Sequence, residues 1–180
     1  LTIRQRIDAI VDPGSFHEVG KLAGVGEYDD AGNLTAFTPS NFIFGTAAIN
    51  GRPVIVSGDD FTVRGGSAAA SIAGKRQQAE GLALELKLPH IRLIDGMGGG
   101  GSVKTIEMAG RTYIPRVAGW ETIVQHLAVA PSVSLALGSV AGIGAAFTAR
   151  SPAAPTAVPT LALAAALAAC RGCCCEQPRS

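Results

Sequence analysis

The sequence has few of the features that nucleic-acid binding requires. Aromatic residues make up only 5% of its 180 residues, so there is no platform of rings on which a single strand could stack. The net charge is +1 at pH 7, and Lys and Arg are scattered along the chain. Scattered cations leave no basic footprint for a phosphate backbone, so we expect no nucleic-acid partner.

Cysteine is absent from the first 169 residues, and all four cysteines lie within residues 170–175. This distribution argues against a disulfide-dependent secreted fold and favours a reducing compartment. Four thiols in one short peptide close a zinc tetrahedron poorly, so we expect no metal site. The first helix-like stretch carries Arg4, Arg6 and Asp8 where a signal peptide needs an apolar core. We therefore expect a cytoplasmic protein, or a mitochondrial matrix protein in a eukaryote.

A long unbroken apolar run is also missing. Residues 151–170 carry no charge, but prolines interrupt them, and only 11 residues separate Pro159 from Arg171. A membrane helix needs about 20 apolar residues, so the segment is too short to span a bilayer. We expect no membrane partner, and we interpret residues 147–180 as a low-complexity tail, disordered or derived from a frameshift.

Hydrophobic periodicity, by contrast, is clear over residues 1–146. It predicts alternating strands and helices, and hence an α/β domain with right-handed crossovers onto a largely buried sheet. Asn50-Gly51 between two apolar runs is a strong hairpin signal. The expected elements are a helix over Thr2–Val11, a loop over 27–41, strands over Phe42–Ala48 and Arg52–Ser57, a helix over Ala68–Leu88 with Ser67 as its N-cap, a strand over Ile91–Asp95, a helix over Trp120–Val129 with Ile123, Val124 and Leu127 inward, and a strand over 132–138.

The stretch "HIRLIDGMGGGGSVKT" contains a literal G-x-G-x-x-G that begins at Gly96. A dinucleotide site would need an acidic residue about 20 positions further on at the end of a strand. The candidate, Glu121, falls inside a predicted helix, and a phosphate loop fails because Val103 precedes Lys104 where the motif has glycine. The run Gly98–Gly101 is then either a turn or, more in keeping with its entropic cost, a place where a ligand touches the backbone.

The stretch "GSVAGIGAA" allows two interpretations that the residues alone leave equal. The backbone N–H groups of Gly142 and Ile143 could stabilise a developing oxyanion at a helix start. Alternatively, the small side chains could serve a tight contact between a helix and a strand.

The titratable side chains give no catalytic set. Asp59 and Asp60 could act as an acid–base pair, but adjacent acids at a strand end are more typically solvated or cap a turn. His17, His90 and His126 are far apart in sequence, and each is expected to be a surface or packing residue. No arrangement of Ser, His and Asp can be argued from the sequence.

Several stretches, in order, resemble one family. They are "RIDAIVDPGSFHEVG", "AAINGRPVIVSGDDFTVRGGS", "PHIRLIDGMGGGGSV" and "VSLALGSVAGIGAA". Together they are similar to the N-terminal half of the carboxyltransferase (beta) subunits of biotin-dependent acyl-CoA carboxylases, of the propionyl-CoA and methylcrotonyl-CoA carboxylase type. The resemblance covers roughly residues 3–146.

This resemblance implies a crotonase-like fold of repeated ββα units, incomplete at the C-terminus. It implies transfer of a carboxyl group from carboxybiotin, carried on a partner subunit, to the α-carbon of a short acyl-CoA such as propionyl-CoA. Carried over to this chain, Gly142 and Ile143 would donate backbone N–H groups to the thioester enolate, with Ile143 standing where many members have glycine. Gly98, Gly99, Gly100 and Gly101, with Gly65 and Gly66, would line the acyl-CoA site.

The family also implies a biotin carboxylase or biotin carrier subunit as partner, and a homo-oligomer. Because the resemblance stops near residue 146, we expect residues 1–146 to be a partial carboxyltransferase domain that shows no carboxylase activity on its own. Three alternatives stay open: a non-catalytic acyl-CoA-binding or assembly fragment, the carboxyltransferase subunit of a decarboxylase, and, more remotely, a nucleotide-binding oxidoreductase.

Overall fold

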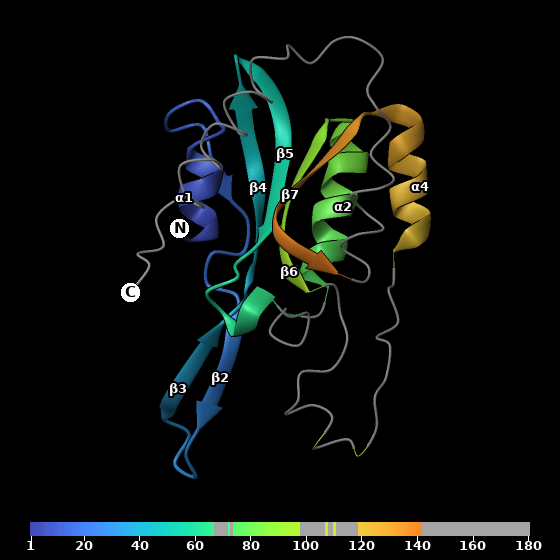
Figure 1. Cartoon of the computed structure of the whole chain (residues 1–180). Helices are drawn as coiled ribbons and strands as arrows, with labels where there is room; N and C mark the ends of the chain where they lie inside the picture. Colours follow the sequence, from blue (N-terminus) through green and yellow to red (C-terminus); the bar gives the residue numbers. More distant parts are fainter. Residues whose placement is uncertain (67–71, 73, 98–106, 108–109, 111–118, 142–180) are drawn as a thin grey trace.

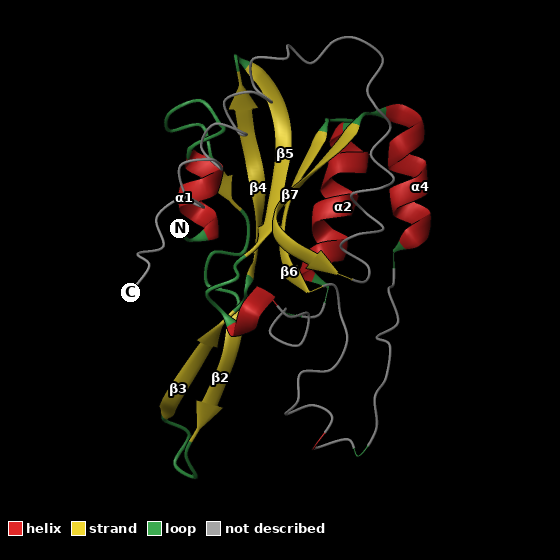
Figure 2. Cartoon of the chain, viewed as in Figure 1, coloured by secondary structure: helices red, strands yellow, loops and turns green. Residues whose placement is uncertain are grey.

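A computed structural model describes residues 1–66, 72, 74–97, 107, 110 and 119–141. Among these residues, five strands form one sheet in the order β1-β4-β5-β6-β7, and β2 and β3 form a separate two-stranded sheet. Helix α1 covers one face of the larger sheet, while α2 and α4 cover the other (Figures 1 and 2). The elements are α1 (Ile3–Asp8), β1 (His17–Glu18), β2 (Gly24–Tyr28), β3 (Leu34–Pro39), β4 (Phe42–Ile49), β5 (Arg52–Asp59), the 3₁₀ turn η1 (Arg64–Gly66), α2 (Lys75–Leu86), β6 (His90–Met97), α4 (Trp120–Val129) and β7 (Ser132–Ala141).

The β4–β5 hairpin forms where the sequence predicts it. Asn50 and Gly51 both have positive φ, 51° and 73°, as the tight turn between twisted strands requires. The Asp12 carboxylate accepts the backbone N–H of Asn50 and that of Gly51, each at 2.8 Å. This carboxylate therefore fastens the turn to the end of the N-terminal segment.

Two parallel crossovers follow the hairpin, as predicted. Helix α2 connects β5 to β6, and α4 connects β6 to β7, with both strand pairs parallel. Helix α4 has the predicted bounds, and Ile123 is buried as expected. The prediction for Val124 is wrong because it is 57% exposed, and His126, three residues after Ile123 on the same face, is buried instead.

Helix α2 is shorter than the predicted Ala68–Leu88. It begins after Gly74, whose φ of +85° is left-handed, and it ends before Lys87, whose φ is +52°. Ala79 and Ala83 are buried, whereas Leu86 is 46% exposed. The proposed N-cap, Ser67, lies outside the described residues.

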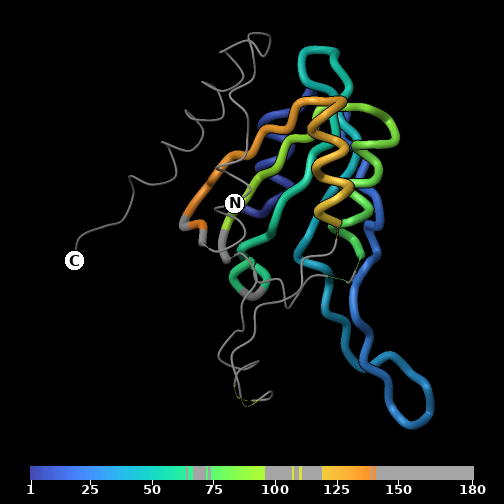
Figure 3. Tube along the Cα trace, turned by 90° about the vertical axis from the view of Figure 1, so that its right-hand side faces the viewer, coloured from blue at the N-terminus to red at the C-terminus, as the bar shows by residue number. Residues whose placement is uncertain are grey.

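The prediction of a loop over residues 27–41 is wrong. Strands β2 and β3 pair there in antiparallel fashion and extend away from the larger sheet (Figures 1 and 3). Asp29 organises the turn, because its carboxylate accepts the N–H of Ala31 at 3.0 Å and the N–H of Asn33 at 2.8 Å. The polar turn residues that indicated a loop therefore form the tip of a hairpin.

The N-terminal helix is also shorter than predicted. A capping box begins it, in which the Thr2 hydroxyl accepts the Gln5 N–H and the Gln5 side chain accepts the Thr2 N–H. The helix ends at Asp8, and residues up to Val11 form turns. Its apolar face packs on the sheet in a core of Ile3, Ile7, Val11, Ile43, Ala47, Val54, Val56 and Leu93.

Candidate functional site

The candidate site lies at one edge of the sheet, where three parallel strands end. Strands β5, β6 and β7 run in the same direction, so Asp59, Met97 and Ala141 come to the same edge. Met97 and Ala141 are directly paired. Ligands in open α/β sheets bind beyond such carboxyl ends, so this edge is where a site is expected.

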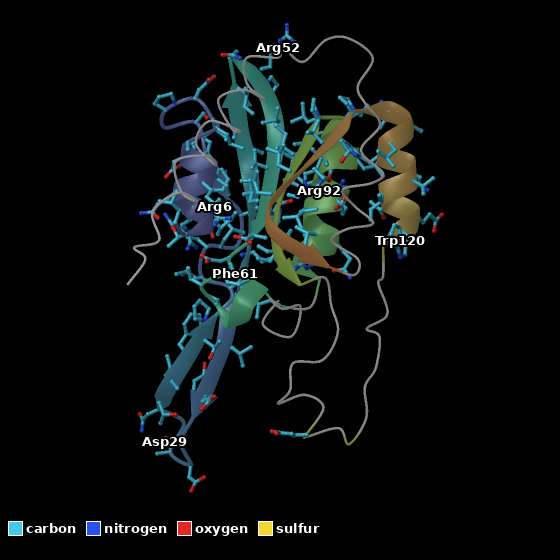
Figure 4. The ribbon with its side chains drawn as sticks, viewed as in Figure 1. Arg6, Asp29, Arg52, Phe61, Arg92 and Trp120 are labelled. Carbon is cyan, nitrogen blue, oxygen red and sulfur yellow. The ribbon has the colours of Figure 1, made fainter. Side chains whose placement is uncertain are left out.

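Every glycine segment that the sequence singled out follows one of these strand ends. Gly65 and Gly66 lie in η1, after β5, with φ values of +62° and +68° that disfavour any residue with a side chain. Phe61, 53% exposed, lies at the same edge, and Arg52 lies at the opposite one (Figure 4).

The other predicted site residues follow β6 and β7 in sequence. Gly98, Gly99, Gly100 and Gly101 follow β6 directly, and Gly142 and Ile143 follow β7 directly, but all six lie outside the described residues. Strand β7 runs to Ala141 rather than to the predicted residue 138. The segment that contains Gly142 therefore begins where β7 is paired with the last residue of β6.

Two ion pairs brace this edge, one on each face of the sheet. On the α1 face, Arg6 donates to the Asp95 carboxylate, and on the α2 face, Arg76 donates to the Asp59 carboxylate. The guanidinium of Arg76 also stacks over the ring of Phe42, 4.6 Å from its centroid. Burial raises the pKa of Asp59, more than the nearby Arg76 charge lowers it.

Of the two roles expected for Asp59 and Asp60, as solvated acids or as turn caps, solvation is wrong because both are buried. Asp60 does cap a turn, because its carboxylate accepts the Thr62 N–H at 3.0 Å and the Thr62 hydroxyl at 2.6 Å. It also accepts the Ile3 N–H, which ties α1 to the end of β5. Both acids thus hold the edge together, and neither is open to a substrate.

A second polar cluster lies inside the molecule, between the sheet and α2. Ser57 Oγ lies 2.8 Å from His90 Nε2, and His90 Nδ1 lies 3.3 Å from Glu80 Oε2. This order of groups matches a Ser–His–acid triad, which residue spacing does not reveal because the three residues lie on three different elements.

Burial excludes a triad function for this cluster. Ser57 is 2% exposed and His90 is fully buried, so no substrate reaches the hydroxyl. Glu80 is also held by Arg92, whose Nη2 lies 2.7 Å from Glu80 Oε2. Burial alone would raise the pKa of Glu80, but hydrogen bonds and charges from His90 and Arg92 lower it to about 2. The cluster is therefore a buried ionic network that connects α2 with β5 and β6.

The three histidines divide between surface and interior. His17 is exposed, whereas the rings of His90 and His126 pack edge-on at 6.2 Å. His126 Nε2 lies 2.8 Å from the Leu88 carbonyl oxygen, so this nitrogen carries the proton. Both buried histidines are packing residues, as predicted.

Within the described part of the chain, no group of three or more His, Cys, Asp or Glu side chains is arranged to hold a metal ion. Helices there also fall short of the length and hydropathy that a membrane crossing requires. The cysteines at 170–175 lie outside the described residues.

Comparison with known proteins decides the family. Residues 1–155 match the carboxyl transferase domain family. The chain belongs to this family. It is 32% identical over 148 residues to the mitochondrial propionyl-CoA carboxylase beta chain of Homo sapiens, a match that covers 79% of this chain and 26% of the relative. It is 34% identical over 96 residues to a biotin-dependent 3-methylcrotonyl-coenzyme A carboxylase beta1 subunit of Mycobacterium tuberculosis, over 53% of this chain and 17% of the relative.

Solved structures of the family share the fold. A transcarboxylase 12S structure with hydrolysed methylmalonyl-coenzyme A bound superposes with a TM-score of 0.56 at 27% identity, over 82% of this chain and 27% of that one. The predicted crotonase-like α/β fold and the predicted membership of a carboxyltransferase enzyme family are thus confirmed. The chain spans about a quarter or less of the length of the relatives described above.

Proposed function

We propose that this chain is the acyl-CoA-binding part of a carboxyltransferase. In this proposal it holds a short acyl-CoA, such as propionyl-CoA, at the edge where β5, β6 and β7 end. The single observation that carries the proposal is the pairing of Met97 with Ala141, because it starts two glycine-containing segments side by side. Family membership supplies the reaction, and the names of the relatives supply the acyl-CoA class.

The chemistry of such a site needs no nucleophilic side chain. Removing a proton from the α-carbon of a thioester places negative charge on the thioester oxygen. The backbone N–H groups of Gly142 and Ile143 are proposed to donate to that oxygen, each contributing roughly 3 kcal/mol to the stability of the enolate. The side chain of Ile143 does not remove an N–H, so the donor survives the departure from glycine.

The remaining backbone at the edge is proposed to bind the substrate. Gly65 and Gly66, and the run Gly98–Gly101, would let the chain approach the acyl-CoA closely because they carry no side chain.

Carboxybiotin on a partner subunit is proposed as the carboxyl donor, and when bound it supplies the carboxyl group to the α-carbon. The proposed partners are therefore a biotin carboxylase or biotin carrier subunit and further copies of the carboxyltransferase. We assign residues 1–146 to the carboxyltransferase domain and residues 147–180 to a segment of different composition. A cytoplasmic or mitochondrial matrix location fits this chemistry.

Two variants at one position test the enolate proposal. Ile143→Pro removes the N–H, whereas Ile143→Gly keeps it and removes only the branched side chain. With imidazole buffer supplied as the base, NMR measures the exchange of the α-protons of propionyl-CoA in D₂O. We expect Ile143→Pro to slow this exchange on the order of 100-fold, because one oxyanion donor is lost. Ile143→Gly should exchange at least as fast as the unsubstituted chain.

Calorimetry with propionyl-CoA, free CoA and NAD completes the test. We expect propionyl-CoA to bind and NAD not to bind. Tight NAD binding, or equal exchange rates for the Pro and Gly variants, would refute the proposal.

A further inference from the structure

The pairing register of β6 and β7 shifts near the candidate site. Ile94 pairs with Ala136, and the next pairs are Gly96 with Val140 and Met97 with Ala141. Two steps along β6 therefore correspond to four along β7, so β7 bulges over residues 137–139. Bulges of this kind re-aim the chain beyond them and are frequent beside active sites.

Asp95 lies opposite this bulge and fills the space that it creates. A Cβ atom on Gly138 would lie only 2.5 Å from Asp95 Oδ1, so the carboxylate occupies the place of a side chain at 138. The other oxygen, Oδ2, accepts a hydrogen bond from Arg6 of α1. The Asp95 side chain is 8% exposed. One carboxylate thus links the N-terminal helix to the bulge between two strand ends.

We propose that the Arg6–Asp95 ion pair positions the acyl-CoA site by holding the β7 bulge, and this rests on the function proposed above. Neither residue touches the substrate in this proposal. They fix which residue of β7 pairs with Met97. This register determines the residues at which β6 and β7 end. A slip of one residue along a strand moves the chain by about 3.3 Å. A misplacement of about 1 Å at a reacting group already costs on the order of 100-fold in rate.

The charge of Asp95 matters more to this role than its shape. Its depth of burial makes a neutral amide a poor partner for Arg6, while the amide has the same size as the carboxylate. Asp95→Asn therefore removes the ion pair and keeps the filled space. Arg6→Gln removes the pair from the other side, and Arg6→Lys keeps the positive charge.

The same helix offers a matched control. Arg4 of α1 makes a bidentate ion pair with Glu18 of β1, at 2.8 and 2.9 Å, and β1 and β7 are the two outermost strands of the sheet. Arg4→Gln therefore removes an ion pair of α1 that lies away from the bulge. It separates a general loosening of α1 from an effect on the bulge.

Two measurements on the full chain test the proposal. Amide hydrogen exchange of Gly96, Met97, Val140 and Ala141 reports on the strand ends without any ligand, with Val56 in β5 as an internal reference. In Asp95→Asn and Arg6→Gln we expect exchange at the strand ends to rise about tenfold or more relative to Val56. Calorimetry should show propionyl-CoA binding weakened about tenfold or more in both variants, largely restored in Arg6→Lys, and unchanged in Arg4→Gln.

The outcomes separate the two proposals. Strand-end exchange that does not change in Asp95→Asn overturns the role of the ion pair in holding the bulge. Faster exchange with propionyl-CoA binding unchanged overturns its role in positioning the site. Equal effects in Arg4→Gln reduce the pair to a general support of α1. Failure of the unsubstituted chain to bind propionyl-CoA refutes the proposed function itself.

Discussion

The two faces of the sheet bury different kinds of side chain. The face under α1 is mainly an apolar core, in which Ile7 of the helix packs with residues such as Val54 and Val56 of β5, and the Arg6–Asp95 ion pair lies where the strands end. The face under α2 places Ser57, His90, Arg92 and Glu80 out of water. Alternation along β5 produces this split, because Val56 and Ser57 point to opposite faces.

This difference determines which residues can be substituted without a large loss of stability. An apolar face tolerates exchanges between apolar residues of similar volume, whereas removing one partner of a buried ion pair leaves the other charged and is strongly destabilising. The apolar core of the α1 face therefore contributes the same stability at every pH. On the α2 face, the packing of α2 against the strands depends on the charge of Glu80.

The largest expected effect comes from removing one partner of the ionic network. Arg92→Leu leaves the Glu80 carboxylate buried without its guanidinium, and we expect the free energy of unfolding to fall by about 4 kcal/mol. Urea denaturation measures the loss. The double variant Arg92→Leu/Glu80→Leu removes both charges and should recover a large part of it. If the double variant is no more stable than Arg92→Leu, the loss does not come from an unpaired charge.

The second-largest effect is expected at acidic pH, where the free energy of unfolding should fall because the α2 face loses its ionic contacts. The pKa of Glu80 is about 2 in the folded chain, against 4.5 unperturbed, so its stabilising contribution is complete above pH 4.5 and is lost as the pH falls toward 2. The full loss amounts to at most about 3 kcal/mol. Burial lowers the pKa of His90 further than Glu80 raises it, so a first decline in stability begins below the ordinary histidine value of 6.5.

Urea denaturation between pH 7 and pH 3 separates these two contributions. Glu80→Gln should reduce the decline below pH 4.5 and keep the earlier one, because His90 is still buried. A Glu80→Gln profile parallel to that of the unsubstituted chain at all pH values would show that Glu80 is not the group responsible.

The smallest effect is expected on the apolar face. Ile7→Val removes one buried methyl group and should lower the free energy of unfolding by about 1 kcal/mol. Because no titrating group is changed, the loss should be the same at pH 7 and at pH 4. A loss at pH 4 that clearly exceeds the loss at pH 7 would contradict the separation of the two faces.

The elements with a strong local signal could be predicted from the sequence. Asn50-Gly51 specifies the β4–β5 turn by itself, and the apolar spacing of Trp120–Val129 specifies α4 with its observed bounds. The β2–β3 hairpin was missed because its Asp29 turn is polar and its strands bury little, with Tyr28 67% exposed. Such strands lack the alternation that marks one face as buried.

The parallel strand ends at which the site is proposed could be predicted from the sequence, but the ion pairs beside them could not. Glycine-rich stretches after apolar runs indicate ligand contact at strand ends, and parallel strands place those ends together. The partners Arg6 and Asp95 are 89 positions apart in sequence, and Glu80 and Arg92 lie on different elements. Pairings of this kind depend on the assembled fold, so residue spacing alone does not reveal them.

The turn at Asn50-Gly51 also affects how the protein ages chemically. Deamidation at an Asn–Gly step begins when the glycine backbone nitrogen attacks the asparagine side-chain carbonyl and closes a five-membered imide. In the folded chain this nitrogen, that of Gly51, donates to the Asp12 carboxylate at 2.8 Å. Folding therefore slows the conversion of Asn50 to aspartate or isoaspartate, because the hydrogen bond to Asp12 restrains the attacking nitrogen.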